Sequence, residues 1–536
     1  MALTETRPSP QTQAQYAAPG ENAGSVERVI GSGDHLTIGR TFIVAALFFG
    51  TLSALGLALS GVDTATENKF LGDSAALVWN SSLIGIILAG ALPLLIGLAI
   101  YLIPLQVGSA AISFPRSAAL SLWTWVIGVL IFAASAVTDG GVGGADADSA
   151  KLGNLAVGLM IVALLGATVS IVTTVLTHRP VGMSLARVPL FSWSMLIAAP
   201  IWILNLSAAL AGVVLGYVSQ ANAAGLTENY DMMIAGLWKA PSVYMLAIPV
   251  LGIAGDVTAK VASRRITAYG AAQGLIAAYG VLSFGVWAAS TRAVASGAWD
   301  HNPTADQTLI FAGWVVLPGL FVLALLGLYG DTIRRSKLRL SAAGVAGPLS
   351  LVLVLGGVLS AALQVVDTFG KGDLVGFGTE QLGVGQGLFL IAAALCGAVG
   401  GTAFWGEKLW GHSSDKLARP SVGLVFAGGG LLGTIAVVQG VLEASEPSTV
   451  LYGAMVAITA ALLMLGLLIG LLSALGAASA GHADPTADDN TGLTLEWAFA
   501  SPPAPAGAGF SVPAVSSPYP LLDLREGPDS SDKESN

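Results

Sequence analysis

The sequence predicts an all-α polytopic membrane protein, a bundle of twelve transmembrane helices. The 536 residues are 54% hydrophobic and only 10% charged, with a mean hydropathy of +0.76. A soluble globular protein carries about 25% charged residues. A hydrocarbon core of about 30 Å needs about 20 apolar residues per helix, and twelve runs of about that length follow one another along the chain.

The twelve predicted spans cover most of the sequence. In chain order they lie at 41–61, 79–103, 118–138, 153–177, 190–218, 232–256, 268–291, 307–330, 341–365, 381–404, 421–442 and 450–476. Each run is long enough to cross the bilayer as a helix. The segments between them are too short for a second domain, so we predict one membrane domain at 41–476.

Two polar segments flank that domain. Residues 1–40 include three prolines and lack an early apolar core, which predicts a flexible cytoplasmic tail and no cleavable signal peptide. Residues 477–536 are rich in Pro, Ser and Asp, with no apolar run long enough to fold alone. We therefore expect a Pro-rich cytoplasmic C-terminal tail.

The placement of Lys and Arg predicts the orientation. With both termini in the cytoplasm, 18 of the 23 basic residues fall on the cytoplasmic side and four on the outer side, while Lys239 falls inside a span. This asymmetry follows the positive-inside rule, and an odd number of spans would destroy it. We expect a multi-pass protein of the cell (plasma) membrane, in contact with the lipid bilayer, with both termini cytoplasmic.

Composition also excludes several functions. The low charge excludes a soluble enzyme, and the net charge of −9 leaves no basic surface for a nucleic acid. The single cysteine, Cys396, excludes a disulfide framework and a cysteine-ligated metal centre. Five histidines are few for a chain of this length.

Five stretches are too particular for a generic membrane helix. They are YLIPLQVGSAAISFPR at 101–116, LTHRPVGMSLARVPLFSW at 176–193, PSVYMLAIPVLGI at 241–253, GVLSFGVWA at 280–288, and LTLEWAFASPPAPAGAGFSVPAVSSPYPLLD at 493–523. Together they resemble subunit I of the haem-copper respiratory oxidases (cytochrome c oxidase), in the family's order and over nearly the whole chain. The resemblance implies a twelve-helix fold, two haems and one copper, electron transfer to oxygen, and other respiratory oxidase subunits as partners.

The family's chemistry needs six histidine ligands, and no matching position here is histidine. In the family, two ligate a low-spin haem, one ligates the haem of the oxygen site and three hold the copper. The aligned positions are Ser82, Ala240, Ala289, Ser290, Gly385 and Gly387. The histidines present are His35, His178, His301, His412 and His482, none in the middle of a predicted span. We therefore predict no haem, no copper and no catalytic residue.

Residues that assist the cofactors in the family are replaced as well. The resemblance aligns Glu443 and Ala444 with arginines that neutralise haem propionates, and Ala111 and Ser242 with carboxylates of the proton paths. We expect an interior almost free of ionisable side chains, without the family's proton relay. Because the residues at the ligand positions are small, and small residues allow close helix approach, we predict a contracted bundle.

Two residues beside the lost metal site are further candidates. Lys239 precedes the lost copper-ligand position; its stem either snorkels to the outer interface, or its ammonium occupies the vacated site as a fixed charge. Tyr244 matches the family tyrosine that is cross-linked to a copper-bound histidine, and its simplest interpretation is a buried tyrosine with one hydrogen-bond partner. Tryptophans near span ends, including Trp405, predict an aromatic belt.

Three functions are compatible with these features. We favour a haem- and copper-free pseudo-oxidase, a structural or assembly subunit of a respiratory membrane complex, whose tail motifs contact other subunits. Family membership alone would predict an active terminal oxidase, but oxygen reduction needs redox cofactors, so we expect that the chain is not itself an enzyme. A small-solute or ion transporter would line its path with the polar in-span residues Asn80, Ser81, Ser82, Asn205 and Gln273.

Overall fold

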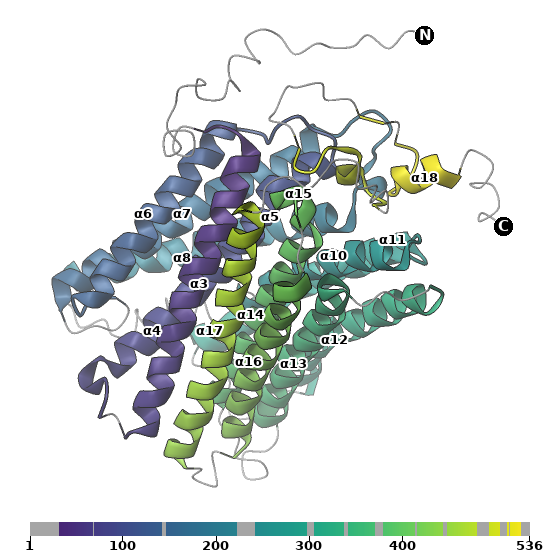
Figure 1. Ribbon diagram of the computed structural model, residues 1–536. Coiled ribbons are helices and arrows are strands. Elements are labelled where there is room, and N and C mark those ends of the chain that lie inside the picture. Colours follow the sequence, from purple (N-terminus) through teal and green to yellow (C-terminus); the bar gives the residue numbers. More distant parts are fainter. Residues whose placement is uncertain are drawn as a thin grey trace.

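The computed structural model describes most of the chain. The described residues are 32–67, 69–141, 146–221, 242–296, 305–336, 341–369, 379–412, 415–442, 448–479, 492–503, 512–513 and 515–526. In these ranges the chain forms a bundle of long helices and no strand (Figure 1). The predicted all-α polytopic fold is confirmed.

The first half of the bundle is α3 (His35–Ala65), a second span in three parts, α4 (Ala75–Gly85), η2 (Ile86–Ala91) and α5 (Leu92–Gln106), then α6 (Pro115–Val137), α7 (Ala147–Thr177) and α8 (Leu190–Ala221). The second half is α10 (Ser242–Ala262), α11 (Tyr269–Ser296), α12 (Ala305–Arg334), α13 (Ala342–Phe369), α14 (Thr379–Phe404), α16 (Asp415–Val441) and α17 (Thr449–Ser479). Short helices follow α14 and lie in the tail: α15 (Gly406–Trp410), η5 (Leu495–Ala498) and α18 (Pro520–Glu526).

Among the described residues, eleven helices are long and apolar enough to cross a membrane, against the twelve predicted. The remaining run, 268–291, does form a helix, α11, but its side chains are described only over 269–283, which is shorter than a span. The sixth run was predicted to end at 256, whereas α10 continues to Ala262 and includes Asp256 and Lys260. Hydropathy placed Asp256 at the end of the run and Lys260 beyond it, and residues 232–241 of the run lie outside the described residues.

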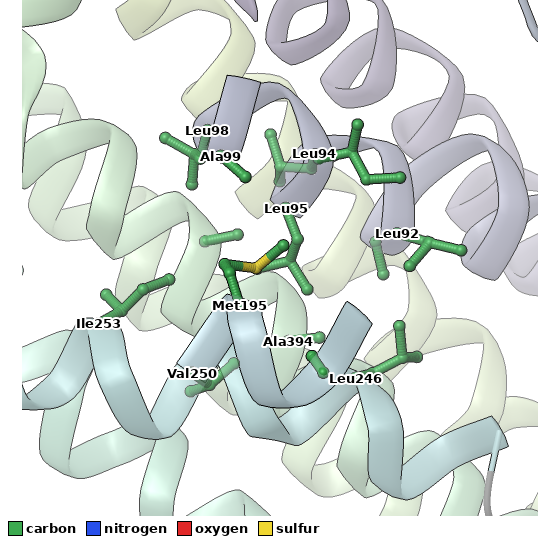
Figure 2. Packing of buried hydrophobic residues seen from close by; sticks show 14 of the residues in the cluster. Leu92, Leu94, Leu95, Leu98, Ala99, Met195, Leu246, Val250, Ile253 and Ala394 are labelled. Carbon is green, nitrogen blue, oxygen red and sulfur yellow. The ribbon is translucent and has the colours of Figure 1, made fainter. Parts of the chain in front are cut away.

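Three helices form the centre of the bundle. The apolar windows of the second span, α10 and α14 are 100%, 89% and 83% buried, whereas the other spans are at most 61% buried. Figure 2 shows that apolar side chains of these helices and of α8 meet there: Leu92, Leu95, Met195, Leu246, Val250 and Ala394. Around this centre, α3 packs against α17, α17 against α16, and α6 against α7.

Local sequence explains several helix boundaries. Asp34 accepts hydrogen bonds from the backbone N–H groups of Leu36 and Thr37, so α3 begins at His35, earlier than the predicted boundary at 41. Asp146 caps α7 in the same way through the N–H of Ser149. The π-helical segment η2 interrupts the second span where Gly90 meets α3, and an added Cβ on Gly90 would lie 3.2 Å from Cα of Gly50.

The described parts of the C-terminal tail return to one end of the bundle, where α3, α6 and α8 begin and α5 and α10 end. We call this the tail end (Figure 1). Arg265 pairs there with Asp523 at 2.6 Å and with Glu526 at 3.0 Å, which fixes α18. Large apolar side chains of the tail are buried: Leu493, Leu495, Val515, Tyr519 and Leu522. The described parts of the tail therefore dock on the bundle of their own chain.

Candidate functional site

Three of the six aligned ligand positions have described, buried surroundings: Ser82, Gly385 and Gly387. Ser82 in α4 lies against Gly56 of α3, where an added Cβ would collide with the Ser82 hydroxyl. An added Cβ on Gly385 would lie 2.7 Å from Cγ2 and 3.1 Å from the backbone N of Val437 in α16. Helices therefore touch at Ser82 and at Gly385, and the contraction of the whole bundle stays a prediction.

The other aligned positions are described less fully. Ala240 and Lys239 lie outside the described residues, so both interpretations of Lys239 stay predictions. Ala289 and Ser290 belong to α11, but their side chains lie outside the described part.

A polar cluster lies next to the two glycines of α14. The rings of Tyr244 and Tyr279 are fully buried, with their centroids 6.0 Å apart. Nε2 of Gln364 in α13 donates a hydrogen bond to Oε1 of Gln386 at 3.1 Å, and Gln386 is a polar neighbour of Tyr244. No described residue meets strict hydrogen-bond geometry with either tyrosine hydroxyl, and Gln386 is the polar side chain that lies near enough to be the single partner expected for Tyr244. Gln386 stands between the two aligned glycines and was not among the predicted site residues.

The side chains at these positions do not fit haem iron or copper. Serine and glycine supply no imidazole, and the contact of Gly385 with Val437 leaves no volume for one. Within the described ranges, no three His, Cys, Asp or Glu side chains converge in a way that could hold a metal. His35 lies beside Asp34, and His178 contacts Ser113 at 3.0 Å, both at the tail end. The absence of a bound haem stays a prediction.

The contact at Gly385 predicts that an alanine substitution lowers stability there much more than at Gly383. We expect Gly385→Ala to lower the free energy of unfolding by about 1–3 kcal/mol, because the added methyl group must displace Val437 or the α16 backbone. Gly383→Ala is the matched control, since its Cβ would meet only Nε2 of Gln364, at 4.0 Å. Thermal unfolding of the purified variants measures the difference. Equal melting temperatures for the two would mean that α14 and α16 are not in contact at Gly385.

Ionisable side chains are buried at the tail end. Nε2 of Gln106, at the end of α5, donates to Oδ2 of Asp256 at 3.1 Å and to Oε1 of Glu496 at 3.2 Å. Asp256 is 3% exposed and Glu496 is fully buried. The expectation of an interior almost free of ionisable groups is therefore wrong at this end. Asp256 stood at the predicted end of its span and Glu496 in the predicted tail, so neither was expected to be buried.

Asp256 ties two helices together. Its carboxylate accepts hydrogen bonds from the backbone N–H groups of Leu190 at 3.0 Å and Phe191 at 3.1 Å, the first residues of α8. Helix N-terminal N–H groups have no intrahelical acceptor, and a carboxylate there also interacts favourably with the helix dipole. The N-terminal cap of α8 is thus supplied by α10.

Glu496 anchors the tail through the LTLEW motif. Oε1 of Glu496 accepts hydrogen bonds from Nε1 of Trp405 at 3.1 Å and from Oγ1 of Thr494 at 2.8 Å, in addition to Gln106. Trp405 is fully buried, so its assignment to an aromatic belt is wrong. Its indole N–H donates to Glu496 inside the protein. A tryptophan of an aromatic belt would instead donate to the lipid headgroup region.

Two lysines flank the motif. Nζ of Lys260 lies 3.3 Å from the centroid of the Trp497 ring, a cation–π contact, and Nζ of Lys408 lies 5.3 Å from it. Nζ of Lys408 also donates to the carbonyl of Phe499. Burial lowers the pKa of Lys408 to about 8, an effect partly opposed by Glu496 and reinforced by Lys260.

The lowered pKa of Lys408 predicts a pH dependence of stability. Its folded pKa of about 8 lies below the usual 10.5, so between these values the unfolded chain binds more protons and stability rises with pH. Between about pH 7.5 and 9.5 we expect the wild type to gain about 1–2 kcal/mol relative to Lys408→Met. Melting temperatures across this range measure the gain. Lys416→Met, at an exposed position, is the control, and a Lys408→Met profile parallel to the wild type would contradict the prediction.

The residues of the transporter hypothesis do not form one site. Nδ2 of Asn205 lies 3.5 Å from the sulfur of Met245, Nε2 of Gln273 donates to the carbonyl of Leu185, and Ser82 lies against α3. Cavities among the described residues include one of about 30 Å³ at the tail end and one of about 520 Å³ on the outer face of α3, α6 and α17. Neither is lined by any of the five residues named for a transport path.

Known proteins resemble this chain over most of its length. Residues 37–472 match the family described as "Cytochrome C and Quinol oxidase polypeptide I". Quinol oxidase subunit 1 of Bacillus subtilis (strain 168) is 29% identical over 278 residues, which cover 47% of this chain and 42% of that protein. Cytochrome c oxidase subunit 1 of Corynebacterium diphtheriae is 27% identical over 321 residues, 53% of this chain and 56% of that protein.

A third relative matches over a longer range. Probable cytochrome c oxidase subunit 1 of Bradyrhizobium diazoefficiens is 25% identical over 464 residues, which cover 78% of this chain and 66% of that protein. The chain spans about half the length of the first of these curated relatives. The matched region contains all the long helices from α3 to the larger part of α17.

Proposed function

Because the chain belongs to the cytochrome c and quinol oxidase polypeptide I family, we propose that it is a haem- and copper-free pseudo-oxidase, a structural or assembly subunit of a respiratory membrane complex. The proposal rests on the aligned ligand positions. All six lack histidine, and at Gly385 the neighbouring helix occupies the space that an imidazole would need.

The way the bundle is stabilised supports a role without a cofactor. Apolar side chains of α5, α8, α10 and α14 pack directly against one another at the centre (Figure 2). Buried polar side chains join α5, α8, α10 and the tail at the tail end. A haem would normally supply much of the central packing in such a bundle, and an empty volume of that size would be destabilising.

The membrane location and orientation are part of the proposal. A protein with eleven described spans resides in a membrane, and we place both termini on the cytoplasmic side of the plasma membrane because Lys and Arg are concentrated there. The tail end then faces the cytoplasm.

A reduced-minus-oxidised visible spectrum with iron and copper analysis of the purified full-length protein tests the proposal first. We expect no haem bands and no stoichiometric iron or copper. Affinity purification of the tagged chain from its native membrane is the second measurement, and oxidase or other respiratory subunits should co-purify. Purification without any respiratory partner would contradict the structural role.

An active terminal oxidase is the second candidate, favoured by the names of the relatives. The quinol oxidase subunit 1 and cytochrome c oxidase subunit 1 proteins are the sequences that this chain resembles. Haem bands at one or two per chain would establish this candidate and overturn the proposal. Ligands would then have to come from outside the positions that Ser82, Gly385 and Gly387 occupy.

A further inference from the structure

A large apolar groove lies on the outer face of the bundle, at the tail end. It has a volume of about 520 Å³ and is formed by α3, α6 and α17. Its lining includes Arg40, Val44, Ala45, Phe48, Trp123 and Leu471. Phe48 is 46% exposed, so the groove opens away from the helix bundle and toward the surrounding bilayer.

The groove has the length of one lipid leaflet. Its residues on α3 run from Arg40 to Phe49, about 13 Å along the axis at the helical rise. Half of the hydrocarbon core of a bilayer is about 15 Å thick. Arg40 lies near the start of α3 and Leu475 near the end of α17, so one end of the groove is at the membrane boundary.

The boundary end of the groove is positively charged. Nε of Arg40 donates to the carbonyl of Leu409 at 2.5 Å and Nη2 to the hydroxyl of Tyr101 at 3.2 Å, contacts that hold the guanidinium in place. Both partners are neutral, and no described carboxylate forms an ion pair with Arg40. A half-buried, fixed guanidinium that has no ion pair with a described carboxylate favours a phosphate group.

We propose that this groove is a binding site for an anionic phospholipid. Its acyl chains lie between α3, α6 and α17, against Val44, Phe48 and Leu471, and its phosphate contacts Arg40. Trp123, an amphipathic ring in the groove wall, is suited to the boundary between chains and headgroup. The charge of the tail end agrees with this lipid class: among the described residues, every Lys and Arg except Lys69, Lys151 and Arg292 lies at that end.

The test uses the full-length protein in detergent and phosphatidylglycerol or phosphatidylcholine with the same acyl chains. Native mass spectrometry should find one phosphatidylglycerol per chain retained in preference to phosphatidylcholine. Arg40→Gln should weaken this retention about fivefold, the effect of one basic residue on an anionic lipid. Ala45→Phe, which places a ring in the groove, should abolish it while leaving Arg40 intact.

Two matched controls test whether the loss of any basic residue, or the addition of any ring, is enough to reduce lipid retention. Arg334→Gln removes a basic side chain that is 79% exposed at the tail end, and Ala133→Phe adds a ring at an exposed position of α6 outside the groove; neither should change retention.

A photoactivatable phosphatidylglycerol on the wild-type protein makes the test independent of variants that fail to fold. Labelling of peptides from α3, α6 and α17 is the expected result. Labelling elsewhere would overturn the proposal, and so would equal retention of phosphatidylcholine. A photo-crosslinker at position 45 that captured a helix of another subunit in native membranes would overturn it too.

Discussion

Asp256→Ala is expected to lower the free energy of unfolding by about 4 kcal/mol, more than any other single side-chain change predicted here. The substitution removes the acceptor of the Leu190 and Phe191 N–H groups and one of the two acceptors of Gln106. All of these donors are buried, so water cannot replace the lost carboxylate without rearrangement. A lost helix cap contributes about 1 kcal/mol and each unsatisfied buried group about 1–3 kcal/mol.

Thermal and denaturant unfolding in detergent and in lipid nanodiscs would measure this loss. Asp256→Asn keeps one acceptor oxygen and should retain part of the stability. Asp331→Ala is the control at the same end, because Asp331 pairs with the exposed Arg334 and Arg335 and such pairs contribute about 0–1 kcal/mol. Equal losses for Asp256→Ala and Asp331→Ala would show that the cap of α8 is not formed by Asp256.

Removal of the tail by truncation after residue 491 is the second large effect, with an expected loss on the order of 5–10 kcal/mol. Five apolar tail side chains, Leu493 to Leu522, are at most 8% exposed, and each leaves a matching apolar surface on the bundle when it is removed. Glu496 leaves with them, so Gln106 and the Trp405 indole lose their acceptor. Lys260 loses the ring of Trp497 that covers its ammonium group.

Truncation after residue 526 is the matched control, since it removes only residues beyond α18. Size-exclusion profiles and melting temperatures in the same detergent would compare the two. The longer chain should behave as the wild type, whereas the shorter one should aggregate or melt far earlier. A shorter chain as stable as the wild type would mean that the tail only rests on the bundle.

The helices could be predicted from the sequence because a membrane-spanning helix requires a run of about 20 apolar residues, which hydropathy detects directly. Every predicted apolar run coincides with a long helix, including the run of α14 that contains Gly385 and Gly387. The family resemblance was equally accessible, since its motifs are short, local and ordered. Hydropathy ended the sixth run at Asp256 and missed the last turns of α10, where Lys260 is charged yet lies within the helix.

The tail-end contacts could not be predicted, because they join residues far apart in the sequence. In the sequence, Glu496 is an acidic residue in a polar segment, which indicates exposure to solvent. In the structure it is buried and accepts a hydrogen bond from Gln106, 390 positions earlier. Asp256 caps a helix that begins 66 positions before it. The contacts of the LTLEW motif with α5, α14 and α15 of its own chain were not predicted, while its contact with other subunits stays a prediction.

The position of these anchors has a consequence for biogenesis. Ribosomes deliver a chain from its N-terminus, and early segments generally fold before later ones are made. Here the ends of α5 and α10 and the short helix α15 are completed by Glu496, Trp497 and Phe499, which are synthesised only after all the long helices of the bundle. A nascent chain that stops before residue 492 therefore exposes, at one side of the membrane, both the apolar surface that the tail covers and the unpaired polar groups of Gln106 and Trp405.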